Sequence, residues 1–277
     1  MTWPVYTRRR GVVHVTRAES VYPTLDAGSV SLIISDGPYG MGKAAWDRQR
    51  GPDGLREWYA PHVEAWGRVC ADAASVYLWG TQRGVRALQP LMEAHGWTWR
   101  VQVTWDKVTT PAMLRPGLWH DVTEACDVYT RGDVSDESPR DGSWNNNRGS
   151  AVHYGNVWRL QAMGPHSPLS RERVRTGRRV VAKTADRVSV DEPVHPCQKP
   201  LTFYDRIIRA SSRPGDLVLE PFGGTLRAAV ACEALPDADA RRYVCIEPDE
   251  DGRGYVPAAL EDLDSRMASP GLFGGMG

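Results

Sequence analysis

The sequence lacks the features that mark several classes of protein. No apolar run reaches 18 residues, so we expect no membrane span. The first 15 residues carry no apolar stretch followed by a small-residue cleavage site, so we expect no secretory signal. No Cys-x-x-Cys pair exists, so we expect neither a zinc site nor a disulfide framework, and a cytoplasmic location fits best; the five cysteines are Cys70, Cys126, Cys197, Cys232 and Cys245.

A net charge is also absent, because 34 basic residues balance 34 acidic ones among 277. A neutral total does not by itself suggest a nucleic-acid-binding protein. The charge is unevenly distributed, however. The 17 residues from Arg171 to Arg187 hold seven basic and two acidic residues, a local net charge of +5. Two interpretations stay open for this stretch: a solvated mobile loop, or a loop that approaches phosphates.

The remaining composition, 41% hydrophobic and 25% charged, is that of an ordinary globular protein with one large or two small domains. Helical periodicity is present at 55–70, from Pro200 onwards, at 225–235 and at 255–267. Pro200 suits a first helical turn, where its missing N–H costs nothing. Seven short apolar stretches between these segments predict strands, at 12–15, 31–35, 75–80, 99–105, 124–130, 216–222 and 242–248. This alternation predicts an α/β sheet with helices on both faces, which binds ligands at the carboxyl ends of its strands.

The first loop at such a strand end is Asp36-Gly37-Pro38-Tyr39-Gly40. Proline and glycine suit a tight β-turn for backbone reasons alone. Alternatively, the loop brings together a carboxylate, a backbone carbonyl and an aromatic ring. The two oxygen acceptors would suit an –NH2 group, and the ring could stack on a flat heterocycle.

The second loop joins a predicted strand to a helix through Glu220-Pro221-Phe222-Gly223-Gly224-Thr225. Glycines at this position let the backbone approach a ligand closely. Glu247 ends the next predicted strand, where an acid can bind ribose hydroxyls. The pair suggests a cofactor that contains adenosine. The glycine spacing of an NAD site, GxGxxG, is missing.

These loops resemble those of the permuted (β-class) DNA amino-methyltransferases, whose motifs are [DNS]PP[YFW] and, later in the chain, DPFxGSGTT. The family also carries an HPTQKP-like stretch and a PGD turn before the second motif, and a G-I-E-like strand after it. The matching segments in this chain are Asp36–Tyr39, His195–Pro200, Pro214–Asp216, Glu220–Thr225 and Cys245–Asp249. The resemblance covers about residues 12–131 and 192–266.

The resemblance implies a Rossmann-like methyltransferase sheet with helices on both faces, a circularly permuted motif order and a small inserted recognition segment. Residues 1–131 would form the catalytic half, 132–191 the target-recognition insert and 192–277 the half that binds S-adenosylmethionine. The substrate would be double-stranded DNA, with no metal required. A homodimer and a cognate restriction endonuclease are further partners that the resemblance allows, in the cytoplasm of a bacterial host.

The resemblance also carries roles over to individual residues. The catalytic residues would be Asp36, Gly37, Pro38 and Tyr39, with the Tyr39 ring stacked on a base flipped out of the duplex. The cofactor-binding residues would be Gln198, Lys199, Glu220, Phe222, Gly223, Gly224, Thr225 and Glu247. The DNA-binding residues would be Arg171, Arg173, Arg175, Arg178, Arg179 and Lys183. An aspartate that opens the first motif favours adenine N6 over cytosine N4 as the target.

Three departures from the family pattern affect what we expect. Gly37 replaces the first proline of the catalytic motif, which would loosen the loop. Leu226 stands where the family has the second glycine of GSG, and Glu220 replaces an aspartate. These departures leave open a second interpretation, a catalytically weakened relative that only binds DNA. Methylation of RNA or of a protein glutamine is disfavoured by the motif order.

Overall fold

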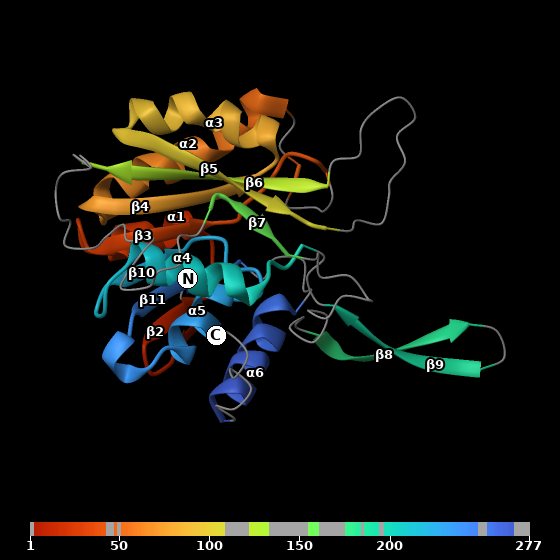
Figure 1. The fold of residues 1–277 in the computed structure, drawn as a ribbon. Helices are drawn as coiled ribbons and strands as arrows, with labels where there is room; N and C mark the ends of the chain where they lie inside the picture. The colour runs from red at the N-terminus through yellow and green to blue at the C-terminus, as the bar shows by residue number, and fades with distance from the viewer. Residues whose placement is uncertain are drawn as a thin grey trace, which may run out of the picture.

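All seven strands expected from the sequence are present, in a sheet with further strands that the sequence pattern did not predict. The computed structural model describes residues 3–42, 47–48, 51–108, 122–132, 155–160, 175–183, 186–193, 197–248 and 254–268 (Figure 1). The predicted seven are β2 (Gly11–His14), β3 (Val30–Ser35), β4 (Cys70–Gly80), β5 (Trp97–Asp106), β6 (Thr123–Arg131), β10 (Leu217–Glu220) and β11 (Arg242–Ile246). The additional strands of this sheet are β1 (Val5–Thr7) and β7 (Val157–Arg159).

The nine-stranded sheet has the order β1-β2-β11-β10-β3-β4-β6-β5-β7. The neighbours from β2 through β11, β10 and β3 to β4 are parallel. Their carboxyl ends therefore lie at the same edge of the sheet. By contrast, β6 runs antiparallel to both β4 and β5, so β6 begins at the edge where β4 ends.

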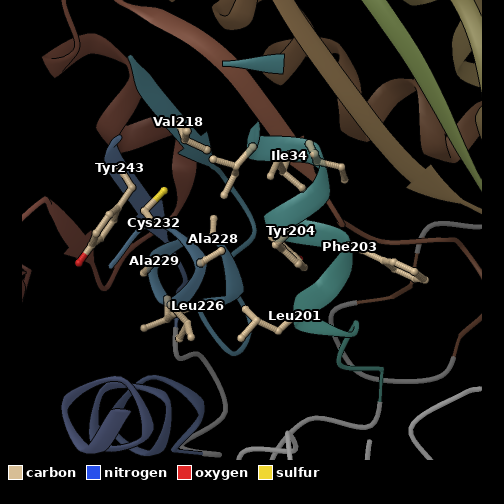
Figure 2. Packing of buried hydrophobic residues seen from close by; sticks show 14 of the residues in the cluster. Ile34, Leu201, Phe203, Tyr204, Val218, Leu226, Ala228, Ala229, Cys232 and Tyr243 are labelled. Carbon is tan, nitrogen blue, oxygen red and sulfur yellow. The ribbon is translucent and has the colours of Figure 1, made fainter. Parts of the chain in front are cut away.

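Helices cover the sheet through two separate hydrophobic cores. Residues of β3 alternate between them, because successive side chains of a strand point to opposite faces. Leu32 and Ile34 belong to the core that contains α4, α5 and α6, part of which is drawn in Figure 2. Ile33 belongs to the core that contains α2 and α3. The helices are α1 (Ala18–Val21), α2 (Gly51–Val69), α3 (Gln82–Ala94), α4 (Leu201–Ser211), α5 (Arg227–Ala234) and α6 (Tyr255–Ala268), with 3-10 turns at Tyr22–Thr24 and Asp237–Asp239.

The sequence pattern missed the short α1 and the longer α3, and it placed Pro200 inside α4. Gly84 and Pro90 lie inside α3 and interrupt its helical pattern, although the hydroxyl of Thr81 caps it by accepting the Gly84 N–H at 3.0 Å. Pro200 precedes α4 as its N-cap residue instead of lying in the first turn. None of the helices in the described part of the chain is long and apolar enough to span a membrane.

The basic stretch between Arg171 and Arg187 is not simply a loop, and the expectation that it would be one is wrong for most of its length. Strands β8 (Arg175–Lys183) and β9 (Asp186–Pro193) form a two-stranded antiparallel sheet, which extends away from the nine-stranded sheet in Figure 1. Strand β8 contains the adjacent Val180 and Val181, and in β9 Val188 and Val190 alternate with polar residues. These β-branched residues favour strands over an irregular loop. Residues 171–174 lie outside the described part.

Part of the predicted recognition insert contributes to the main sheet. Strand β7 lies within residues 132–191 and pairs in parallel with β5. The Trp105 indole N–H donates to the Leu160 carbonyl at 2.7 Å and fastens the end of this segment. The boundaries of the three predicted units stay predictions.

Candidate active site

A cavity of about 500 Å³ opens at the edge where the parallel strands end. Segments after β2, β3, β10 and β11 contribute to its wall, with side chains from α2 and residues 197–199 before α4. A volume of this size is typical of sites for small molecules and cofactors. The fold thus brings both loops singled out in the sequence to one cavity.

The catalytic carboxylate expected at the end of β3 is paired with a lysine from far along the chain. Lys199 Nζ lies 2.9 Å from each carboxylate oxygen of Asp36. It also donates to the hydroxyl of Tyr39 at 2.8 Å, and that hydroxyl donates to Asp36 Oδ1 at 2.8 Å. Burial raises the pKa of Asp36, and the Lys199 ammonium opposes that rise. The ion pair supplies the compensation that a buried carboxylate requires.

A second carboxylate completes this arrangement. Glu124 Oε2 lies 3.1 Å from Lys199 Nζ, and Glu124 Oε1 lies 2.6 Å from Lys107 Nζ. Burial works to raise the pKa of Glu124, but the two ammonium groups outweigh it and hold the pKa at about 2. Charges therefore alternate in sign from Asp36 through Lys199 and Glu124 to Lys107.

The backbone after the catalytic motif is held by Asp47. Its carboxylate accepts the N–H groups of Tyr39 at 2.8 Å, Gly40 at 2.6 Å and Met41 at 3.1 Å. Asp47 is buried, with 2% of its surface exposed. Three donors on one carboxylate fix the turn that follows the motif.

Gly37 occupies a position with no room for a side chain. A Cβ built on Gly37 would lie 2.5 Å from the hydroxyl oxygen of Tyr59 and 2.9 Å from Phe222 Cδ2. The proline of the family motif would meet the same atoms. Gly37 therefore fits a locally crowded site, where Tyr59 and Phe222 fill the space, and the loose loop expected from the sequence is constrained by these neighbours.

The turn after β10 is bound to the end of β11. Gly223 N–H donates to the Ile246 carbonyl at 2.8 Å, and Gly224 N–H donates to Glu247 Oε2 at 2.8 Å. A Cβ at Gly223 would lie 3.0 Å from Leu226 Cδ2 and 3.3 Å from the Ile246 oxygen. The glycines allow this close approach and leave bare backbone facing the cavity.

Leu226 adopts the left-handed conformation that glycine favours, with φ 56° and ψ 42°. This explains why a glycine suits the corresponding position of the family motif. Such a backbone costs a non-glycine residue about 1–2 kcal/mol. The Leu226 side chain is fully buried in the core of α4, α5 and α6 (Figure 2), and this burial offsets the cost.

Aromatic side chains form one wall of the cavity. The ring of Phe222 lies 5.0 Å from those of both Trp58 and His62, measured between centroids. Burial lowers the pKa of His62 to about 4, so this wall is uncharged at neutral pH. Its surface suits a flat, apolar ring.

The cavity collects most of the predicted site residues but not all of them. Tyr39 and Glu220 are not among the lining residues. The Tyr39 hydroxyl is bound to Asp36 and to Glu124. The Glu220 side chain is buried, with 1% of the residue surface exposed. Lys199, predicted on the cofactor side, lies against the Asp36 carboxylate, which was predicted as catalytic. The predicted residues that line the cavity are Asp36, Gly37, Pro38, Gln198, Lys199, Phe222, Gly223, Gly224, Thr225 and Glu247.

The Glu220 carboxyl group contacts the backbone of α5 and the side chain of Cys245. Its Oε2 accepts the Ala228 N–H at 3.2 Å and lies 3.2 Å from Cys245 Sγ, at the start of α5. Burial raises the pKa of Glu220 to about 8. The carboxyl group thus caps the helix that follows the turn.

Several predicted residues lie outside what the structure describes. Arg171 and Arg173 precede β8, and His195 lies in an undescribed segment. The backbone of Arg175, Arg178, Arg179 and Lys183 belongs to β8. Their contact with DNA stays a prediction.

Sequence reasoning missed Glu124, Lys107 and Asp47 as members of the site. Lys107 ends the segment VTWDK (103–107) and Glu124 begins the segment EACDVYTRG (124–132), but nothing local marks either residue as part of the Asp36 site. Asp47 gave no signal beyond its closeness to the first motif. Among the residues described, no three His, Cys, Asp or Glu side chains are grouped so as to hold a metal ion.

A sheet with parallel central strands, a glycine turn after β10, an acid after β11 and a carboxylate loop after β3 is the arrangement of a Rossmann-like methyltransferase. Residues 30–253 match the family N6_N4_Mtase, described as DNA methylase. The chain therefore belongs to this DNA methylase family.

Relatives of known name differ in the base they modify. The chain is 26% identical to the DNA adenine methyltransferase YhdJ of Escherichia coli K12, over 87% of this chain and 78% of YhdJ. Its fold is similar to that of the cytosine-N4-specific PvuII DNA methyltransferase, with a TM-score of 0.65 and 14% identity over 96% and 95% of the two chains. It is also similar to M1.HpyAVI in complex with S-adenosylmethionine, with a TM-score of 0.58 and 16% identity over 91% and 98%.

S-adenosylmethionine is the methyl donor of this family, and the described cavity fits it. Glu247, which lines the cavity, would supply an acceptor for ribose hydroxyls, and Phe222 would supply an apolar surface for an adenine ring. The bare backbone of Gly223 and Gly224 leaves room for the amino-acid end. The residues present therefore match the chemistry of each part of the donor.

Proposed function

We propose that this DNA methyltransferase transfers a methyl group to the N6 amine of adenine in double-stranded DNA. The observation that carries the proposal is the Asp36–Lys199 pair in the wall of the cavity. Support for adenine comes from the aspartate that opens the motif and from the similarity to YhdJ, an adenine enzyme. Transfer to cytosine N4 is the second candidate, because PvuII shares the fold.

The target amine needs activation by hydrogen-bond acceptors. An exocyclic amine is a poor nucleophile, because its lone pair is delocalised into the base. The Asp36 carboxylate and the Gly37 carbonyl would accept its two N–H groups and localise the lone pair on nitrogen. Bound S-adenosylmethionine supplies an electrophilic methyl group to that nitrogen.

Lys199 would keep Asp36 in the form that this role requires. A protonated Asp36 has lost acceptor capacity, and burial favours protonation. The ammonium group on both carboxylate oxygens opposes protonation. Tyr39 also donates to Oδ1, so the lone pair left for the amine is on Oδ2. Asp36 would then accept the proton released from the methylated amine and pass it to water.

The neighbouring loops would orient the reacting groups. Glu247 would accept from the ribose hydroxyls, and the backbone from Phe222 to Thr225 would approach the amino-acid end of the donor. Gln198 would contribute from the opposite wall. Alignment of amine, methyl and sulfur would then supply much of the rate.

Tyr39 has a second role in this proposal, in addition to stacking on the base. Its hydroxyl bridges Asp36 and Glu124, with distances of 2.8 and 3.2 Å. This contact fixes the direction of the ring. We infer that Tyr39 both orients Asp36 and offers the edge of a stacking surface for a flipped base.

DNA would be recognised through residues 132–191. The basic residues of the hairpin would contact phosphates, which gives a salt-dependent affinity; they are Arg175, Arg178, Arg179 and Lys183, preceded by Arg171 and Arg173. A homodimer and a cognate restriction endonuclease are predicted partners. We place the enzyme in the cytoplasm of its host.

The test is a methylation assay with isotopically labelled S-adenosylmethionine and unmethylated genomic DNA. Digestion to nucleosides and mass spectrometry then identify the modified base. The variant Asp36→Ala should lose the signal, while Asp26→Asn, at an exposed carboxylate, should retain it. N6-methyldeoxyadenosine would support the proposal, and N4-methyldeoxycytidine would replace adenine by cytosine.

The same assay, combined with calorimetry of donor binding, distinguishes a wrong substrate from a lost activity. If the donor binds but no DNA base is modified, DNA is the wrong substrate, and RNA and protein are tested next. If calorimetry detects no donor binding either, the chain is a DNA-binding relative that has lost catalysis.

A further inference from the structure

Arg227 stands at a position where the family motif has a threonine. In the motif DPFxGSGTT, the first threonine follows the second glycine, which corresponds to Leu226. Arg227 begins α5, directly after the cofactor turn. Its side chain is buried, with 1% of the residue surface exposed, and it lines the cavity. A charge in this location requires a partner.

One edge of the guanidinium group is fixed by the protein. Arg227 Nε donates to the Thr225 carbonyl at 2.8 Å, and Nη2 donates to Asp262 Oδ2 at 2.8 Å. Asp262 is shared, because Arg266 Nε lies 3.0 Å from both of its carboxylate oxygens. These contacts leave little freedom to the Arg227 side chain.

The remaining nitrogen, Nη1, is buried and has no hydrogen-bond partner within the described part of the chain. An arginine carries five N–H donors, and a buried donor without an acceptor is costly. Lys199, the other buried cation at the cavity, already contacts Asp36, Glu124 and the Tyr39 hydroxyl. Arg227 thus offers donor capacity next to the cofactor turn that the described protein groups do not use.

We propose that Arg227 Nη1 binds the carboxylate at the methionine end of S-adenosylmethionine; this inference rests on the proposed function. A guanidinium group is well suited to a carboxylate, and it stays charged at any physiological pH. The donor would approach through its amino-acid end, towards which the Gly223–Thr225 backbone is expected to face. Arg227 would then bind the donor through a charged group, at the position where the family motif has a threonine.

The test compares two ligands that differ only in this carboxylate: S-adenosylmethionine and its decarboxylated form. Calorimetry measures both dissociation constants for the wild-type chain, Arg227→Met and Asp262→Asn. We expect Arg227→Met to weaken binding of S-adenosylmethionine about 10- to 100-fold and that of the decarboxylated ligand less than about threefold. Asp262→Asn disturbs the same ion pair but keeps Nη1, so it should preserve the preference for the carboxylate.

Equal weakening of both ligands by Arg227→Met would overturn the assignment, because it would show that Arg227 acts only on the structure. Unchanged binding of S-adenosylmethionine would overturn it as well. If Arg227→Met does not fold, as judged by its thermal transition without ligand, Arg227→Lys is measured, and the preference for the carboxylate should still fall more than threefold. A wild-type chain that binds neither ligand would overturn the proposed function and this assignment with it.

Discussion

Lys199 Nζ lies at the same distance, 2.9 Å, from both carboxylate oxygens of Asp36, although 163 positions separate the two residues. The pair joins the end of β3 to the segment before α4. A buried carboxylate and a buried ammonium group compensate each other only while both are present. The loop that begins at Asp36 and the segment that holds Lys199 therefore depend on one another.

Replacing Lys199 by methionine should abolish methylation at neutral pH. Without the ammonium group, burial raises the pKa of Asp36 further, and the protonated acid no longer accepts the amine hydrogen bonds. We expect kcat to fall at least about 100-fold, with partial recovery at higher pH. The measurement is kcat as a function of pH, beside the dissociation constant of S-adenosylmethionine. Lys107→Met is the matched control, because Lys107 pairs with Glu124 and not with Asp36. It should lower kcat less than about tenfold. An active Lys199→Met enzyme would contradict the role given to this lysine.

Replacing Glu124 by glutamine should change the pH dependence more than the maximal rate. The negative charge of Glu124 raises the pKa of Asp36, so its removal lowers that pKa. The acidic limb of the kcat profile should then move to lower pH, by up to about one unit. Glu93→Gln, at an exposed carboxylate bound to Gln89, should leave the limb in place. A shift to higher pH would show that Glu124 acts in another way.

Alanine at position 37 should destabilise the protein, and removal of the Tyr59 hydroxyl oxygen should restore part of the lost stability. The new Cβ would lie 2.5 Å from the Tyr59 hydroxyl oxygen. We expect Gly37→Ala to lower the free energy of unfolding by about 1–3 kcal/mol. Combining it with Tyr59→Phe should recover part of this loss, as a coupling of at least about 0.5 kcal/mol in a double-mutant cycle. Chemical denaturation of the four proteins measures it.

Gly67→Ala is the control for this cycle. Gly67 lies in α2, and its Cβ would meet no atom within 4 Å. Its substitution should be neutral or stabilising. Additive effects of Gly37→Ala and Tyr59→Phe would mean that the crowding is relieved elsewhere.

Glycine at position 226 should be tolerated better than alanine. Both substitutions lose the buried side chain of Leu226, which costs about 2–5 kcal/mol. Glycine in addition relieves the left-handed backbone, by about 1 kcal/mol. Elsewhere in a helix the order is reversed: at Val230, inside α5, alanine should be the more stable by about 1 kcal/mol. Denaturation of the four variants tests the inversion, and the same order at both positions would refute it.

Glu220 should make the protein less stable as the pH rises. Its pKa is about 8 in the folded protein, against an ordinary value of 4.5, so the folded state binds more protons between these values. Its contribution is fully present below about pH 4.5 and is lost as the pH rises towards 8. Glu220→Gln should reduce the loss of unfolding free energy between pH 6 and 8.5 by a few kcal/mol at most. Glu261→Gln, at an exposed position, should retain the wild-type slope.

Hydrophobic patterning was sufficient to predict the framework of the fold. Strands such as β3 are buried on both faces, so their sequences are short continuous apolar runs. Such runs between turn residues are typical of buried strands. The helix α3 was missed, because Gly84 and Pro90 obscure its pattern although tertiary contacts stabilise it. The hairpin was missed, because charge dominated the interpretation of a segment whose β-branched valines favour strands.

The sequence by itself determined the family, the two loops and the residues that chemistry requires in them, since these signals are local and short. Only the tertiary structure decided what surrounds Asp36. Because β6 runs antiparallel to β4, Glu124 at its start comes to the edge where the parallel strands end. The segment before α4 brings Lys199 to the same point. Long-range pairing of this kind leaves no periodic trace in the sequence, because it depends on the order and direction of strands in space.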